Sequence, residues 1–349
     1  MPGIRSHGGW RRMQRIRRVA AHSAYGTVAG GAWYYIPRLG DGQKLKATAP
    51  RYTPDTEYGG FRRRVAIHHR FEVRGDFTGL MYPESALFLM DMALLRVGTA
   101  GNDYEDIYQH VMDVFTPEDP RRYTGVIADT IRIRGSGTGD GEIQVTLGLI
   151  ARSEAREASL DEATFEAAYD LLSLVPFMHG HARLYLNSAL VTDVEDWTIE
   201  VNNNAAMGPL TFQAAGHSYI SYAKANKRAI TLALSELNNS DDFNAAIRSG
   251  VEMTFQVLAT HPDGHIMQII LPRLAVEESD EDGTPSAQAK EAPRMIALEA
   301  DSGIYEGEDI VYAVDLAAGG TTMLEMITTT PAPTTTTAAP TTSTTTAAP

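Results

Sequence analysis

Seven residues at positions 135–141 have a spacing that could bind a phosphate group. They read Gly-Ser-Gly-Thr-Gly-Asp-Gly, so glycine alternates with small polar residues. A phosphate-binding loop would end in Lys followed by Ser or Thr and would lead into a helix, and neither condition is met here. The flanking residues alternate between apolar and polar, which is typical of strands. We therefore interpret the segment as the turn of a β-hairpin.

Two pairs of histidines could bind a metal ion. His68 and His69 are neighbours in a predicted strand, where adjacent side chains point to opposite faces, so they cannot chelate one ion together. His179 and His181 could share a face, but no carboxylate stands beside them at a ligand spacing. The chain has no cysteine, which excludes thiolate ligands, disulfides and cysteine nucleophiles. We predict no metal and no cofactor, and a surface or interface role for these histidines.

Three acidic residues precede Trp197, and carboxylates beside an aromatic residue could form a glycosidase pair. They are Asp193, Glu195 and Asp196. A glycosidase needs its second carboxylate held across a cleft, whereas these three lie on one predicted strand in a chain rich in acids. The patterns Gly-x-Ser-x-Gly and His-Glu-x-x-His do not occur. We therefore predict no catalytic residues and no enzyme.

The charges are distributed unevenly along the 349 residues. Residues 1–75 carry fifteen Lys and Arg against four Asp and Glu, whereas the rest carries fifteen against forty. A basic head on an acidic body suggests nucleic-acid contact or self-association, and we favour self-association because Gly, Pro and Tyr separate the basic residues. We expect the head to contact the acidic segments 103–119 and 277–282 of another copy. We expect no membrane span and no signal peptide, because no apolar run is long enough.

The other predicted elements are arranged around residues 182–204, ARLYLNSALVTDVEDWTIEVNNN. The apolar residues within 184–191 predict one strand. From 197 to 201, Trp, Ile and Val alternate with polar residues, the period of a half-buried strand. The asparagines at 202–204 end it, because asparagine tolerates left-handed backbone. We expect the second strand to be an open sheet edge that seeks a partner.

Periodicity and turn residues predict the remaining elements. The predicted strands are 32–36, 62–75, 126–134, 142–151, 228–237, 251–258, 265–271, 295–300 and 309–315. The predicted helices are 84–97, which follows Pro83, and 243–248, with 161–173 as either a short helix or a polar loop. The predicted loops are the acidic segments 104–120 and 277–293.

Four segments divide the chain. Residues 1–60 form a basic irregular arm, of which 1–24 is expected to be flexible, and residues 328–349 form a Thr, Ala and Pro tail that cannot bury enough surface to fold. Between them, 61–180 and 181–327 are two halves related by a weak repeat at an offset of 164 residues. Coincidence explains the repeat about equally well. One tube fold and two tandem tube-fold halves therefore both stay open.

In the order of its elements, the segment 60–315 resembles the tube proteins that form the hollow tails of long-tailed bacteriophages. The resemblance is one of pattern and order, without an enzyme-style motif. The residues that carry it are RRRVAIHHRFEVRGDFTGLMYPESALFLMDMAL, TGVIADTIRIRGSGTGDGEIQVTLGLIAR, ARLYLNSALVTDVEDWTIEVNNN, KRAITLALSEL and MQIILPRL. The basic arm and the Thr-rich tail depart from the compact core of this family.

The resemblance implies a mainly β fold, a tube-type β-barrel or sandwich with short flanking helices. It also implies a structural virion protein that forms stacked trimeric or hexameric rings in the host cytoplasm. Its partners would be itself, other tail proteins and double-stranded DNA, which passes through the channel without sequence-specific binding. The alternative is a virion surface, decoration or adhesion protein with a Thr-rich stalk. We expect the subunit interface to include Arg62, Arg63, Arg64, Glu195, Trp197, Ile199, Val201, Lys227 and Arg228.

Overall fold

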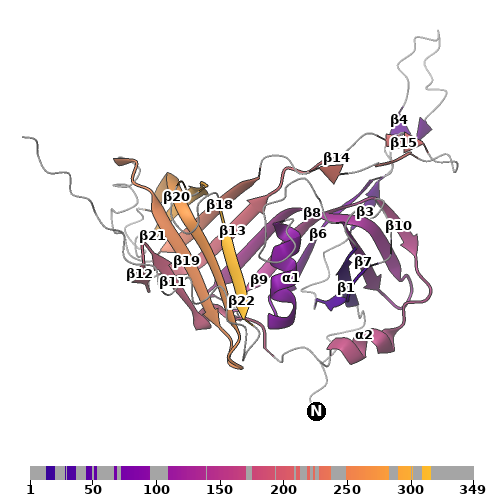
Figure 1. The fold of residues 1–349 in the computed structure, drawn as a ribbon, viewed down its shortest axis with the longest axis horizontal. Helices are drawn as coiled ribbons and strands as arrows, with labels where there is room; N and C mark the ends of the chain where they lie inside the picture. The colour runs from indigo at the N-terminus through magenta and orange to yellow at the C-terminus, as the bar shows by residue number, and fades with distance from the viewer. Residues whose placement is uncertain are drawn as a thin grey trace, which may run out of the picture. The chain divides into compact units, whose positions relative to one another are not determined.

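The 16-residue strand β8 (Arg121–Ser136) connects the two parts of the main sheet. Its first half pairs with β7 (His110–Phe115) and β10 (Ser153–Arg156). Its second half pairs with β9 (Gln144–Ala151) and β13 (Val194–Asn202). Strand β8 therefore pairs with two different strands along each of its two edges, and the sheet branches at β8 (Figure 1).

All of these elements belong to one compact unit, residues 1–317. The computed structural model describes residues 13–19, 28, 30–36, 45–48, 51–52, 67–68, 72–94, 109–138, 140–169, 175–192, 194–207, 210–212, 218–220, 223–224, 228–236, 249–282, 290–299, 301 and 309–315. The predicted tail 328–349 and the predicted helix 243–248 lie outside them.

Beyond β13 the sheet continues through strands from the second half of the chain. In order these are β18 (Ala229–Glu236), β21 (Lys290–Ala297), β20 (Ile266–Asp282), β19 (Met253–Thr260), β11 (Ala182–Leu186) and β12 (Ala189–Val191), with β22 (Val311–Asp315) also on β20. Beyond β7 lie β1 (Met13–Arg18) and β2 (Tyr34–Tyr35), and beyond β9 lie β6 (Glu72–Leu80) and β3 (Lys46–Thr48). The division at residue 180 stays a prediction, although β8 and β13 join strands from either side of it.

Smaller elements complete the described structure. Three two-stranded sheets are β4 (Arg51–Tyr52) with β5 (Ile67–His68), β14 (Ala206–Met207) with β17 (Ala223–Lys224), and β15 (Leu210–Phe212) with β16 (Ser218–Ile220). The helices are α1 (Pro83–Ala93), α2 (Glu162–Tyr169) and the short 3-10 helix η1 (His179–His181). The fold is mainly β, as predicted, and every pairing between described strands is antiparallel.

The core lies between the strands and helix α1. Along β13, Trp197, Ile199 and Val201 are fully buried, because alternate residues of a strand face one side. Helix α1 begins at Pro83, whose missing N–H suits a first helical turn. It packs against strands from both ends of the chain, including β2, β8 and β22 (Figure 1). The helix therefore covers the point where the sheet branches.

Most of the predicted strands are confirmed, and so is the helix after Pro83. The turn at 135–141 joins β8 to β9 as a hairpin, and His261–Gly264 joins β19 to β20. The segment 62–75, predicted as one strand, contains β5 and the start of β6, which continues to Leu80, while residues 62–66 and 69–71 lie outside the described residues. The segment 161–173 contains α2, whose first turn is capped by Asp161: its Oδ1 accepts the amide of Ala163 at 2.8 Å.

The strand predicted at 184–191 is wrong, because the chain reverses in the middle of it. Asn187 and Ser188 both have positive φ, 50° and 66°, and they form the two-residue turn between β11 and β12. Two consecutive left-handed residues give a turn whose twist matches that of antiparallel strands. Apolar residues recur at 184 and 186 and again at 189 and 191, so both sides of the turn look strand-like, and the shift in their spacing at Asn187 and Ser188 is a local sign of the reversal.

Three segments predicted to be irregular contain strands. The flexible arm predicted at 1–24 contains β1, which pairs with β7 along its whole length. The acidic loop predicted at 104–120 contains β7 itself. In the loop predicted at 277–293, β20 continues to Asp282 and β21 begins at Lys290. Charge was a misleading signal in these segments, because charged residues also belong to strands here: Asp113 is fully buried in β7, and residues 278–282 pair with β21.

We expect Gly135→Ala to lower the free energy of unfolding by about 1–3 kcal/mol, the usual cost of overpacking a core. A Cβ at Gly135 would lie 2.4 Å from Nε1 of the buried Trp197, its directly paired neighbour on β13. Urea unfolding of the purified variant measures the change. Gly180→Ala is the matched control, since a Cβ there meets no atom within 4 Å. Equal stability of the two variants would contradict the close contact between Gly135 and the indole.

Candidate assembly and channel surfaces

The sheet face opposite the core carries two rows of mostly polar residues across six strands, although Leu80, Ala233 and Ile296 are apolar and Leu80 is buried. The strand register from β6 to β21 defines two of these rows. One row consists of Thr78, Thr146, Arg132, Glu200, Thr231 and Ile296, and the next consists of Leu80, Gln144, Arg134, Thr198, Ala233 and Arg294. We call this surface the polar face.

Ion pairs balance the charges on the polar face. Arg132 donates from Nε and Nη2 to one carboxylate oxygen of Glu200, at 3.0 and 2.7 Å. Arg134 lies 3.5 Å from Asp196. Both arginine side chains stay more than half exposed, so they remain at the surface of the sheet while paired. The face is therefore polar and exposed, and these arginines are charge-compensated.

The two ends of the longest strand path are open and carry exposed apolar residues. Among the described strands, β12 pairs only with β11 and β2 pairs only with β1. Leu190 on β12 is 54% exposed. Tyr34 on β2 is 36% exposed and stacks on Phe88 with ring centroids 4.1 Å apart. Unpaired strand edges of this kind can pair with another chain.

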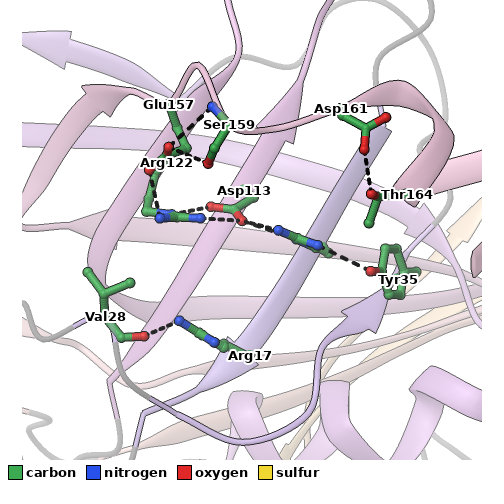
Figure 2. Close-up of polar contacts among 10 residues, drawn as sticks. Arg17, Val28, Tyr35, Asp113, Arg122, Glu157, Ser159, Asp161 and Thr164 are labelled. Atoms are coloured by element: carbon green, nitrogen blue, oxygen red, sulfur yellow. Dashed lines mark hydrogen bonds and ion pairs between the residues drawn. The ribbon is translucent and has the colours of Figure 1, made fainter.

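A buried aspartate fastens the N-terminal strand to the sheet. Asp113 on β7 is fully buried and accepts hydrogen bonds from Arg15 on β1 at 3.0 Å and from Arg122 on β8 at 2.7 Å. Figure 2 shows Asp113 beside Arg122, which also reaches Glu157 at 2.7 Å. The hydrogen bond that Arg122 donates to Asp113, together with the charge of that carboxylate, raises the pKa of Arg122. Three strands thus share one charge-paired cluster.

The arginines of β1 also stack on an aromatic residue. The guanidinium carbons of Arg15 and Arg17 lie 4.2 and 4.3 Å from the centre of the Trp33 ring. Arg17 donates a hydrogen bond to the carbonyl of Val28 (Figure 2), and burial followed by the charge of Arg122 lowers its pKa. These basic residues make contacts within their own chain. That the basic head contacts another copy stays a prediction, although Arg15 and Arg17 already have partners within their own chain.

A second cluster joins helix α1 to strands from both ends of the chain. Asp91 on α1 accepts hydrogen bonds from Arg18 on β1, at 3.0 Å, and from the hydroxyl of Tyr312 on β22. At the end of the helix, Asn203 donates to the carbonyl of Ala93 at 2.7 Å. The last carbonyls of a helix have no partner within the helix, so this distant side chain supplies one.

The predicted interface residues fall in three places. Arg62, Arg63, Arg64 and Lys227 lie outside the described residues. Arg228 pairs with Asp309, with the Nη2 and Oδ1 atoms 2.5 Å apart, and it also reaches the carbonyl of Leu94 at 3.4 Å. Glu195, Trp197, Ile199 and Val201 are on β13.

Strand β13 is not the open edge that was predicted, because β8 pairs along one side of it and β18 along the other. The side chains of Trp197, Ile199 and Val201 are buried in the core of their own chain. Their assignment to a subunit interface stays a prediction, but the open edge that motivated it is absent.

The residues considered for chemistry are mostly separated or already paired. Among the described residues no three His, Asp or Glu side chains are grouped so that they could hold a metal ion. Asp196 pairs with Arg134, and Asp193 and His69 lie outside the described part of the chain. His179 and His181 are both in η1, and burial lowers the pKa of His179 despite the opposing charge of Asp196.

Sequence reasoning did not single out Asp113, Asp91, Asn203 or Tyr312. One signal for Asp113 was present, since apolar residues flank it on both sides in the stretch Val-Met-Asp-Val-Phe of β7. An acid in such a strand needs a partner, because a buried unpaired charge is costly. The partners themselves could not be identified, because Arg15 is 98 residues away in the sequence.

We expect the stability of the protein to fall between pH 7 and pH 5, in part through His110. Burial, assisted by the charge of Arg18, lowers the pKa of this fully buried histidine to about 3. Below its unfolded pKa of about 6.5, the unfolded chain binds a proton that the folded chain excludes, which costs about 2 kcal/mol by pH 5. Denaturant unfolding of the wild-type chain and His110→Phe at both pH values measures the difference. An identical pH dependence for both proteins would refute this assignment.

The fold and these surfaces define a mainly β protein, in which buried aspartates join strands and a helix to one another. A family model described as phage tail tube protein matches residues 17–302. The chain therefore belongs to the phage tail tube protein family, and the resemblance seen in its sequence is confirmed. A comparison with curated protein sequences gave no match. In the described part of the chain, neither helix has the length and apolar character needed to cross a bilayer.

Proposed function

We propose that this phage tail structural protein is the tail tube subunit, which assembles with itself into stacked rings around a channel for double-stranded DNA. The observation that carries the proposal is the polar face, a continuous wall of six antiparallel strands without a covering layer of described residues. The open ends at β12 and β2 support it. They differ from each other, and two different complementary surfaces are what a head-to-tail ring needs.

The same geometry suggests how a ring could be built. Joining the β12 edge of one copy to the β2 edge of the next would continue the main sheet from copy to copy around the channel. If each chain supplies two tube folds, three chains complete a ring of six folds, and if each supplies one, six chains do so. Other tail proteins are the expected partners at the two ends of the tube. The protein acts as a scaffold in the virion tail, assembled in the host cytoplasm, and carries out no catalysis.

Electron microscopy of the purified protein over a range of concentrations tests the assembly. We expect rings and hollow tubes, and size-exclusion chromatography should show a monomer or a small oligomer at low concentration. A chain that stays monomeric at high concentration, with no rings or tubes in the images, would refute the proposal.

A single introduced cysteine tests which face lines the channel, since the natural chain has none. Thr198→Cys places a thiol in the middle of the polar face, directly opposite Arg134 of the neighbouring strand β8. In assembled tubes we expect a small maleimide to react with it and a large polymer-linked maleimide to be excluded. Reaction with both reagents would place Thr198 on the outer surface, and reaction with neither would place it in a subunit contact. Either result contradicts a channel position.

A further inference from the structure

Two exposed arginines on the polar face would meet the DNA backbone if this face lines the channel. Arg132 and Arg134 are two residues apart on β8, so both side chains project from the same side of the strand. Their exposed fractions are 57% and 51%. The planar guanidinium group is well suited to bind phosphate with paired hydrogen bonds. Two such groups on an open sheet would hold a passing duplex by its phosphates.

The neighbouring strand supplies an acid for each arginine. Glu200 is directly opposite Arg132 in the register of β13 and β8. Asp196 is diagonal to Arg134, which is itself opposite Thr198. Asp196 and Glu200 therefore lie on either side of Thr198 along β13, and each of them pairs with one of the two arginines. The Nε and Nη2 donors of Arg132, one of the two guanidinium edges that could bind a phosphate, are both occupied by Glu200.

These ion pairs contribute little to the stability of the fold. Exposed pairs typically contribute about 0–1 kcal/mol, because water solvates both charges well. The strands below them are already held by the buried residues Trp197, Ile199 and Val201 and by the backbone ladder. The main effect of the two ion pairs is therefore on the charge of the surface, because they cancel positive charge where DNA would pass.

We propose that Glu200 and Asp196 keep Arg132 and Arg134 from binding DNA phosphates, so that the polar face lets a duplex slide past without holding it. The proposal rests on the proposed function, because it assumes that this face lines the channel. It adds the specific residues that make the wall non-adhesive. Without the acids, each copy in a ring would present two free guanidinium groups to the DNA.

The test is a DNA titration with the double variant Glu200→Gln, Asp196→Asn. Both changes keep the shape of the side chain and remove its charge. A fluorescein-labelled duplex of about 20 base pairs is titrated with unassembled protein, checked by size-exclusion chromatography, over a salt series. Each phosphate contact adds about 0.9 to the slope of log K against log salt, so two freed arginines should steepen that slope by about two. At low salt the variant should bind at least about tenfold more tightly than the wild-type chain.

The matched control is Glu118→Gln with Asp119→Asn, in the loop between β7 and β8. This control removes the same amount of negative charge, but next to the opposite end of β8. It also removes one ion-pair partner of Arg121, whose guanidinium lies 2.7 Å from Asp119. Gains confined to the polar-face variant support the proposal. An unchanged DNA affinity of the polar-face variant would overturn the proposal. An equal gain in the control would overturn it too, because the change in net charge alone would then explain the tighter binding. The titration uses unassembled protein, so its result does not depend on tube formation. A failure to form tubes in the electron microscopy experiment would refute the proposed function on its own.

Discussion

Trp197→Ala is expected to lower the free energy of unfolding by about 3–5 kcal/mol, the range for truncating a large buried aromatic residue. The indole is fully buried in the main core and lies directly over Gly135 on the paired strand. Alanine would leave a cavity between β13 and β8 that the tightly paired strands cannot close. Urea unfolding followed by circular dichroism gives the change, and the midpoint should fall without a change in its slope.

Trp197→Phe is the control for this variant, because it keeps an aromatic ring in the same space and should lose less. The pair of variants also separates a core role from an interface role. A core residue affects stability at any protein concentration, whereas an interface residue affects assembly. Normal stability of Trp197→Ala together with loss of rings would contradict the core assignment and would support the predicted interface.

Asp113→Asn is expected to cost about 3–5 kcal/mol of folding free energy, because removing one partner leaves buried charge uncompensated. Asp113 is fully buried, and the side chains of Arg15 and Arg122 are only 12% and 19% exposed. The substitution preserves the shape of the side chain, so the loss reports the charge and its hydrogen bonds. Denaturant unfolding of the variant and the wild-type chain, at the same pH and salt, measures it.

Glu277→Gln is the matched control, since it removes one acid from an exposed pair, with Arg294 3.9 Å away. Its free energy of unfolding should stay within about 0.5 kcal/mol of the wild-type value. Limited proteolysis adds a second measurement, because weakening the Asp113 cluster should release β1 and expose the N-terminal segment first. Equal stability of the two variants would show that the cluster does not hold β1 in place.

The elements that local patterns describe well could be predicted from the sequence. Strand β13 was predicted because its buried residues recur at every second position. The hairpins at 135–141 and His261–Gly264 were predicted from their glycines and, in the second, a proline, which allow the backbone to reverse. Pro83 similarly indicated the start of α1. Each of these signals depends on a few neighbouring residues, which is why one sequence was sufficient.

The position of each strand within the sheet was decided only by the tertiary structure. A strand with one apolar face has the same alternation at an edge as in the middle, because the backbone hydrogen bonds that distinguish the two leave no trace in the side chains. Strand β13 was therefore predicted as an edge and is interior. Arg15 pairs with the buried charge of Asp113, and Asn203 donates to the last turn of α1. In both contacts the two partners are distant in the sequence. Such contacts arise when chain segments meet in the fold, so local spacing does not contain them.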